Sequence, residues 1–162
     1  MSFCLEEVFE MACQIERDGA AFYRRAADEV ESDDARELFT KLAQWEKHHE
    51  KVFRDLAGDI PEEKRSEYVD PDGEASAYID AMIEGTIFKP KSANEWVPST
   101  PGGVFETAIG KEKDSIMFYL GMKEAIPTGA EEVDRIIAEE IRHVRILSRL
   151  AAQMEEVGGT ES

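Results

Sequence analysis

The chain has 162 residues, of which 42% are hydrophobic and 34% are charged, as expected for one globular domain with its own core. A formal net charge of −17 argues against nucleic-acid binding, because phosphate neutralisation needs clustered Lys and Arg. The same charge would attract cations, although it also suits a solvated helical surface. No apolar run approaches the roughly 20 residues that a membrane-spanning helix needs.

Apolar residues at three- and four-residue spacings predict four long helices. The first runs from about Phe3 to Glu31, and the second from Asp33 to about Gly58. The third follows Thr100-Pro101, a pair typical of the N-cap and first position of a helix. The fourth starts in the string Thr128-Gly-Ala-Glu131.

Short connections within each half predict two antiparallel helix hairpins, joined by a long crossover over residues 58–101. Within the crossover, Glu74–Glu84 has helical spacing and ends at Gly85, which predicts a short extra helix. We therefore expect an all-α four-helix bundle that forms a single domain over residues 1–162, with a frayed tail at 158–162.

Cys4 and Cys13 are the only cysteines. Nine residues apart on one predicted helix, they lie on opposite sides and cannot pair with each other. We interpret them as reduced thiols of a cytoplasmic protein. Without a Cys-x-x-Cys pair, the chain carries no thiolate iron or zinc module.

Six polar residues fall within the apolar stripes of the four predicted helices. Each half of the chain offers a Glu and, about thirty residues later, a Glu-x-x-His motif; the six are Glu16, Glu46, His49, Glu112, Glu140 and His143. The first Glu of each half also opens a repeated Glu-x-Asp-x-x-x-Phe-Tyr string. The repetition indicates that the two halves build one site together.

Buried carboxylates must protonate, pair with a cation or bind metal, and no Lys or Arg stands at a matching core position. Two divalent cations would cancel four carboxylate charges, while neutral imidazoles add ligands without charge. Glu46 and His49 share one helix face and can hold one ion, as can Glu140 and His143. This ligand set predicts a two-iron site, although zinc or manganese suits the same ligands.

Tyr23 and Tyr119 lie two turns after Glu16 and Glu112. We expect each to hydrogen-bond a ligand carboxylate, with a core tyrosine satisfied elsewhere as the alternative. Trp45 is expected to serve packing only. The other polar neighbours are expected on solvated faces or are given no role; they are Asp18, His48, Glu50, Glu106, Asp114 and Glu139.

At these motifs the chain resembles the ferritin-like superfamily, most closely the diiron domain of the rubrerythrin branch, over nearly its whole length. The resemblance implies that Glu46 and Glu140 bridge two irons, with Glu16 and Glu112 as ligands from the first and third helices. It implies an oxidoreductase that reduces hydrogen peroxide or dioxygen. We also expect an external electron donor, such as a rubredoxin-type protein, and a homodimer.

Two departures from rubrerythrins narrow this expectation. The rubredoxin-type module with four cysteines is missing, and Ile109 stands where rubrerythrins have an extra third-helix Glu. The ligand set thus resembles more closely the symmetric four-Glu, two-His pattern of ferritins and bacterial oxidase-type diiron proteins. Two other functions stay open: a ferroxidase with iron storage in a hollow cage, and a non-catalytic metal-binding or structural bundle.

Overall fold

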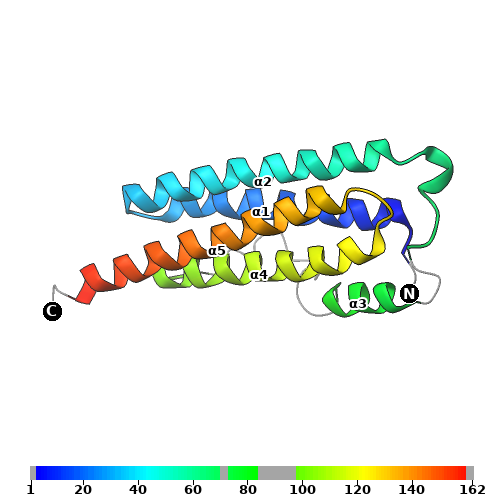
Figure 1. The fold of residues 1–162 in the computed structure, drawn as a ribbon. Helices are drawn as coiled ribbons and strands as arrows, with labels where there is room; N and C mark the ends of the chain where they lie inside the picture. The colour runs from blue at the N-terminus through cyan, green and yellow to red at the C-terminus, as the bar shows by residue number, and fades with distance from the viewer. Residues whose placement is uncertain (1–2, 70–72, 84–97, 160–162) are drawn as a thin grey trace.

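The computed structural model describes residues 3–69, 73–83 and 98–159. Four long helices dominate it, namely α1 (Leu5–Glu29), α2 (Asp33–Asp59), α4 (Pro101–Ala125) and α5 (Ala130–Gly159) (Figure 1). Between α2 and α4 lie the 3-10 helix η1 (Glu62–Lys64) and the short helix α3 (Glu74–Met82). The predicted all-α bundle, with an extra helix in its crossover, is confirmed.

Helices α2 and α4 begin where the sequence offers caps. The Ser32 hydroxyl accepts a hydrogen bond from the backbone N–H of Ala35 at the start of α2. Thr100 caps α4 in the same way, through the N–H of Gly103, and Pro101 occupies the first turn as predicted. The predicted Gly85 end of the short helix lies outside the described residues, as do residues 160–162 of the tail.

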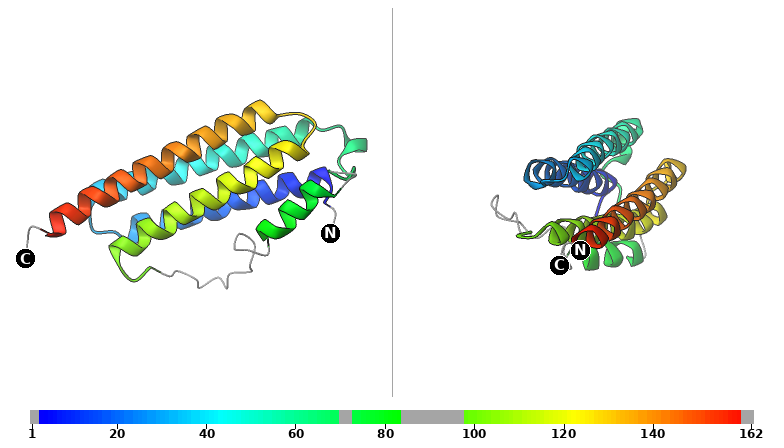
Figure 2. Two further views of the ribbon diagram at one scale, coloured as in Figure 1. Left: turned by 60° about the horizontal axis from the view of Figure 1, so that its bottom comes forward. Right: turned by 90° about the vertical axis from the view of Figure 1, so that its left-hand side faces the viewer.

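The long helices form two antiparallel hairpins, α1 with α2 and α4 with α5, packed against each other in two layers (Figure 2). Across the layers, α1 faces α4 and α2 faces α5, and these pairs are antiparallel as well. Because α2 ends at the opposite end of the bundle from the start of α4, the connection between them must return along the bundle (Figure 1). This topology places the middles of all four helices side by side.

The start of the crossover is tied to the start of α1. An isolated antiparallel bridge joins Cys4 to Tyr68, and the N–H groups at the start of α1 donate to crossover carbonyls, Leu5 to Glu67 over 3.1 Å among them. These bonds satisfy N–H groups that a helix start leaves without an intrahelical partner. The end of α2 and the start of α1 are therefore held together.

The apolar core is split into two clusters along the bundle. The Phe53 cluster fills one end and includes Phe9, Phe53, Phe118, Met122 and Ile136. The Phe39 cluster fills the other end and includes Phe39, Leu42, Val104, Phe105 and Leu147. Along every long helix, the residues between the two clusters include a buried Glu. A polar layer therefore crosses the middle of the core.

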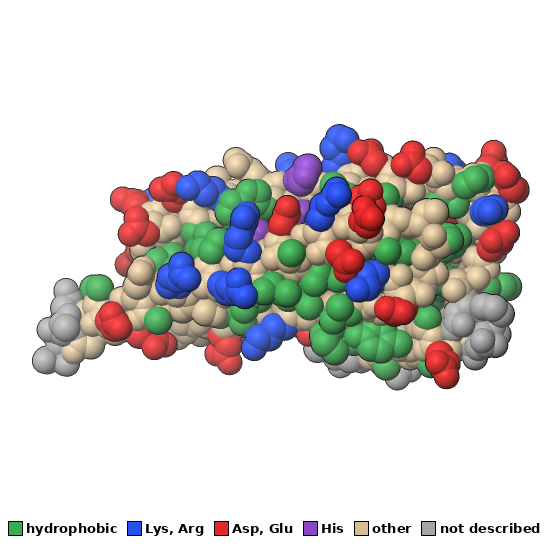
Figure 3. All heavy atoms as spheres, viewed as in Figure 1, with side chains coloured by type: hydrophobic (Ala, Val, Ile, Leu, Met, Phe, Trp, Pro, Cys, Tyr) green, Lys and Arg blue, Asp and Glu red, His purple; other side chains and the backbone are tan. Residues whose placement is uncertain are grey.

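On the face that Figure 3 shows, acidic and basic side chains are interspersed along the helices, and apolar side chains gather around α3. None of the helices in the described part of the chain combines the length and apolar character needed to cross a membrane.

Helix α3 packs on the outside of α4 through Tyr78. The Tyr78 hydroxyl donates to the carbonyl of Met117 over 2.5 Å, and its ring lies directly over Gly121. A Cβ atom at Gly121 would lie 2.2 Å from two ring carbons of Tyr78, far inside van der Waals contact. The absence of a side chain at Gly121 thus allows the Tyr78 ring of α3 to pack against the backbone of α4.

We predict that Gly121→Ala lowers the free energy of unfolding by about 1–3 kcal/mol, because the added methyl group displaces the Tyr78 ring from α4. Hydrogen exchange over residues 74–82 should accelerate. Gly110→Ala is the matched control, because nothing lies within 4 Å of its added Cβ and alanine favours the helix. Equal melting temperatures for the two variants would contradict this packing.

Candidate metal centre

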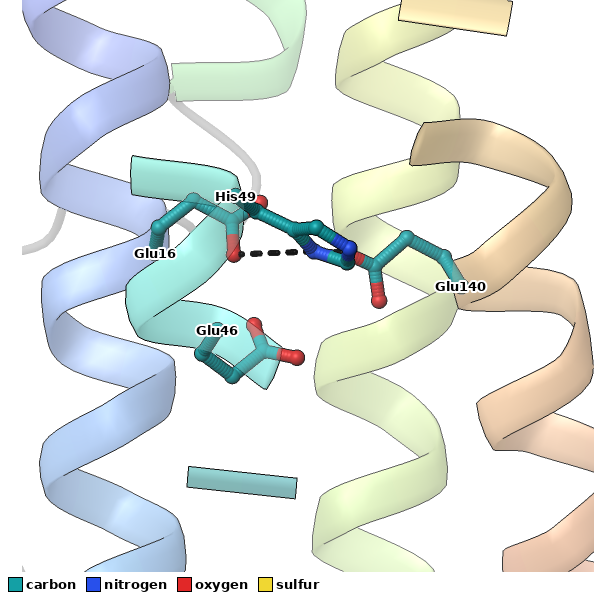
Figure 4. Close-up of side chains that lie close together, drawn as sticks. All are labelled: Glu16, Glu46, His49 and Glu140. Carbon is teal, nitrogen blue, oxygen red and sulfur yellow. Dashed lines mark hydrogen bonds and ion pairs between the residues drawn. The ribbon is translucent and has the colours of Figure 1, made fainter. Parts of the chain in front are cut away.

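The six predicted ligand residues meet in the polar layer at the middle of the bundle. Glu16 comes from α1, Glu46 and His49 from α2, Glu112 from α4, and Glu140 and His143 from α5. All six are buried, with at most 3% of any of them exposed. Figure 4 shows the side chains of Glu16, Glu46, His49 and Glu140 converging from three helices.

Glu140 lies between the two imidazoles. One carboxylate oxygen lies 2.9 Å from Nδ1 of His49, and the other lies 3.1 Å from Nδ1 of His143. The two rings are nearly parallel, with centroids 5.8 Å apart. Both histidines therefore turn Nδ1 toward the same carboxylate.

Two buried carboxylate oxygens in the layer have no hydrogen-bond partner. They are Oε2 of Glu16, which lies 3.5 Å from Nδ1 of His49, and Oε1 of Glu46, which lies 3.5 Å from Nδ1 of His143. An unpartnered buried carboxylate oxygen is costly unless a cation or proton satisfies it. These two atoms fit metal ions in the layer.

The candidate ligand atoms form two groups that share two members. One group comprises Glu16, Glu46, His49 and Glu140, and the other comprises Glu46, Glu112, Glu140 and His143. Within each group the ligand atoms lie within 4.8 Å of one another. Each group thus offers three carboxylates and one imidazole, a donor set suited to iron, zinc or manganese.

The layer receives no charge from a buried Lys or Arg in the described part of the chain. Burial raises the pKa of Glu16, Glu46 and Glu140, and repulsion from neighbouring carboxylates raises it further. Without metal, protons must therefore supply part of the neutralisation.

Both histidines bind protons tightly in the absence of metal. Burial lowers the pKa of His49, but the hydrogen bond to Glu140 and the negative charge of Glu16, 3.5 Å away, outweigh burial and raise the pKa to about 12. For His143, the neighbouring carboxylates of Glu112, Glu140 and Glu46 likewise outweigh burial, and the pKa rises to about 11. Metal ions would compete with these protons for the same Nδ1 atoms.

Tyr23 and Tyr119 connect the two hairpins at the centre. The Tyr23 hydroxyl donates to Oε1 of Glu112 over 2.5 Å, and the Tyr119 hydroxyl donates to Oε1 of Glu16. Burial, and then the adjacent carboxylate, raises the pKa of each tyrosine well above its ordinary value, so both remain neutral donors. Each tyrosine therefore bonds a candidate ligand of the other hairpin.

Two contacts were missed by sequence reasoning, which assigned Glu139 to a solvated face and Trp45 to packing alone. Glu139 Oε2 lies 2.5 Å from Nε2 of His49, and the Trp45 ring stacks on His143 with centroids 5.0 Å apart. The available signal was the repeat, because Trp45 and Glu139 each immediately precede a Glu-x-x-His motif.

The remaining polar neighbours lie away from the centre. His48, Glu106 and Asp18 are exposed, and Asp18 accepts a hydrogen bond from Gln14. Glu50 pairs with the surface residues Arg17 and Arg54. Ile109 packs against the Phe39 cluster and adds no ligand.

The arrangement of helices and the central Glu and His layer define a ferritin-like bundle. A solved structure from Thermotoga maritima, described as a ferritin-like diiron-carboxylate protein, is similar to this chain with a TM-score of 0.71 at 21% sequence identity. The match covers 95% of this chain and 98% of that one. At this identity the likeness establishes the shared fold.

The family model for Rubrerythrin matches residues 7–94, and the chain belongs to the rubrerythrin family. Glu16, Glu46 and His49 lie within the matched segment. Glu112, Glu140 and His143 lie beyond it, and the fold brings them into the same layer. A search of curated proteins found no match.

We predict that metal stabilises the protein more at pH 8 than at pH 6. The raised pKa values of the buried carboxylates and histidines mean that the folded metal-free protein holds more protons than the unfolded chain, so its stability falls as pH rises above about 4.5. Metal displaces those protons, so the metal-bound protein does not lose this stability as the pH rises. The difference in stability between the two forms is therefore larger at pH 8. Melting temperatures with and without Zn²⁺ across this range check the sign; a metal effect independent of pH would contradict it.

We predict that Gly19→Ala weakens metal binding without unfolding the protein. A Cβ atom at Gly19 would lie 2.8 Å from Oε2 of Glu46 and push that carboxylate out of place. Alanine itself favours the helix by about 1 kcal/mol. Calorimetric Zn²⁺ titration should show a higher Kd than for wild type and for the Gly110→Ala control. Unchanged affinity in Gly19→Ala would contradict the placement of Glu46.

Proposed function

We propose that this protein is an oxidoreductase with a two-iron centre that reduces hydrogen peroxide or dioxygen. The observation that carries the proposal is the pair of buried, unpartnered oxygens on Glu16 and Glu46, in a layer of four carboxylates without a buried Lys or Arg in the described chain. Membership of the rubrerythrin family supports iron as the metal. Bound iron would supply the electrons that reduce the oxidant.

The proposed ligands follow from the two groups of side chains. Glu16 and His49 would hold one ion and Glu112 and His143 the other. Glu46 and Glu140, which belong to both groups, would bridge the pair. Four carboxylates balance the charge of two divalent ions, so the metal-loaded layer would be neutral. The two oxygens of Glu140, each facing a different histidine, suit a bridging role.

The surrounding residues would orient the ligands and exclude water. Tyr119 binds one oxygen of Glu16 and leaves the other oxygen free for an ion. Tyr23 holds Glu112 through one oxygen as well. The Phe53 and Phe39 clusters close the layer at both ends, which keeps the local dielectric low and strengthens the binding of cations.

The electrons that return the iron to its reduced state would come from a donor outside this bundle. The chain has two cysteines, both free, and so lacks the four thiolates of a rubredoxin-type iron module. We propose an external donor of that type and a cytoplasmic homodimer. A dimer measured by light scattering would favour this assignment over iron storage, which would require a hollow multimer of many chains.

We predict that protein loaded anaerobically with iron binds about two Fe²⁺ per chain and that rapid mixing with peroxide or dioxygen oxidises them. The faster oxidant identifies the substrate. Glu112→Ala should lose at least half of the iron, because it removes a ligand and leaves Tyr23 without its acceptor. A wild type that binds no iron would refute the proposal, as would a Glu112→Ala variant with full iron content.

A further inference from the structure

Trp45 and Glu139 occupy equivalent places in the two halves of the chain. Each lies one residue before the first Glu of a Glu-x-x-His motif, and each contacts the histidine of the other motif. The candidate ligands therefore repeat between the halves, whereas the side chains that contact the two histidines from outside the ligand set differ: Glu139 contacts His49, and Trp45 contacts His143. This difference sets the surroundings of His49 apart from those of His143.

Behind His49 stands a carboxylate. Oε2 of Glu139 lies 2.5 Å from Nε2 of His49, while Nδ1 on the other side of the ring faces Glu140 and Glu16. The Glu139 side chain is 44% exposed, so it reaches the buried ring from the surface. A metal-bound histidine whose second nitrogen donates to a carboxylate has a fixed ring orientation and is a stronger ligand.

Behind His143 stands an indole. The Trp45 ring is nearly parallel to the imidazole, at an interplanar angle of 10°, and the guanidinium of Arg142 lies over the indole at 5.8 Å. Stacking restrains the plane of the ring but contributes no negative charge. The Arg142 guanidinium over this indole adds a positive charge on this side, which disfavours a cation.

We infer that Glu139 is a positioning residue for His49, and that it makes the metal position at Glu16, Glu46, His49 and Glu140 fill before the one at His143. By accepting the Nε2 proton, Glu139 leaves Nδ1 of His49 free to bind metal. The inference rests on the proposed two-metal function and adds an order of loading to it.

The three histidines of the chain permit a direct test. Zn²⁺ is added stepwise to metal-free protein labelled with ¹⁵N, and the imidazole nitrogens are followed by NMR, with exposed His48 as the internal reference. In wild type, Nδ1 of His49 should change with the first equivalent of Zn²⁺, while Nε2 keeps its proton. The signals of His143 should change with the second equivalent.

Variants separate the hydrogen bond from the charge. Glu139→Ala removes both and should weaken the His49 position by about 10- to 100-fold, so that His143 responds first or together with His49. Glu139→Gln keeps a neutral acceptor, and the Zn²⁺ affinity of its His49 position should lie between those of wild type and Glu139→Ala. Asp18→Asn removes an exposed charge near Glu16 without touching His49 and should preserve the wild-type order.

Each remaining outcome overturns the inference. If the two histidines respond together in wild type, or His143 responds first, the order of loading is wrong. If Glu139→Ala keeps the wild-type order and affinities, Glu139 does not position His49. Failure of Zn²⁺ to bind at all would instead remove the proposed two-metal function, and the order of loading with it.

Discussion

Four carboxylates in the middle of an apolar bundle are the constraint on which the structure depends. Glu16, Glu46, Glu112 and Glu140 are fully or almost fully buried, and their mutual repulsion in a medium of low dielectric is strong. Bound protons relieve this repulsion in part when metal is absent. Two divalent cations would relieve it completely and would allow so polar a layer to interrupt a well-packed core.

The rest of the bundle supports that layer. Apolar clusters on both sides hold the four helices at a fixed register, and the neutral phenols of Tyr23 and Tyr119 each satisfy one carboxylate oxygen. Since each phenol satisfies only one oxygen, the carboxylates keep their capacity to bind cations. Structural hydrogen bonds and candidate metal ligation thus share the same side chains without competing.

The sequence predicted the helices and the six central residues because both depend on a short-range pattern. A Glu or His in an apolar stripe must point inward wherever the stripe is buried, so Glu16 or His143 can be placed without knowing its neighbours. Thr100-Pro101 marked the start of α4 for a similarly local reason.

What the sequence could not provide depends on the packing of one hairpin against the other. The partners of Tyr23 and Tyr119 follow from the register between α1 and α4, which no local pattern encodes. The contact of Glu139 with His49 was missed because Glu139 is one position off its stripe and reaches the ring from a different helix. The contact between Tyr78 and Gly121 likewise joins segments more than forty residues apart.

The exchange of tyrosines between hairpins has a consequence for how such a chain arises. Each half carries the same Glu-x-Asp-x-x-x-Phe-Tyr string, yet its tyrosine serves the carboxylate of the other half. Neither hairpin alone contains a complete site, so an ancestral single hairpin would have needed to associate with a copy of itself. Gene duplication and fusion replace that association with an intramolecular one, at an effective concentration on the order of millimolar. Two fused copies can change independently, and the equivalent positions 45 and 139 carry Trp and Glu in this chain.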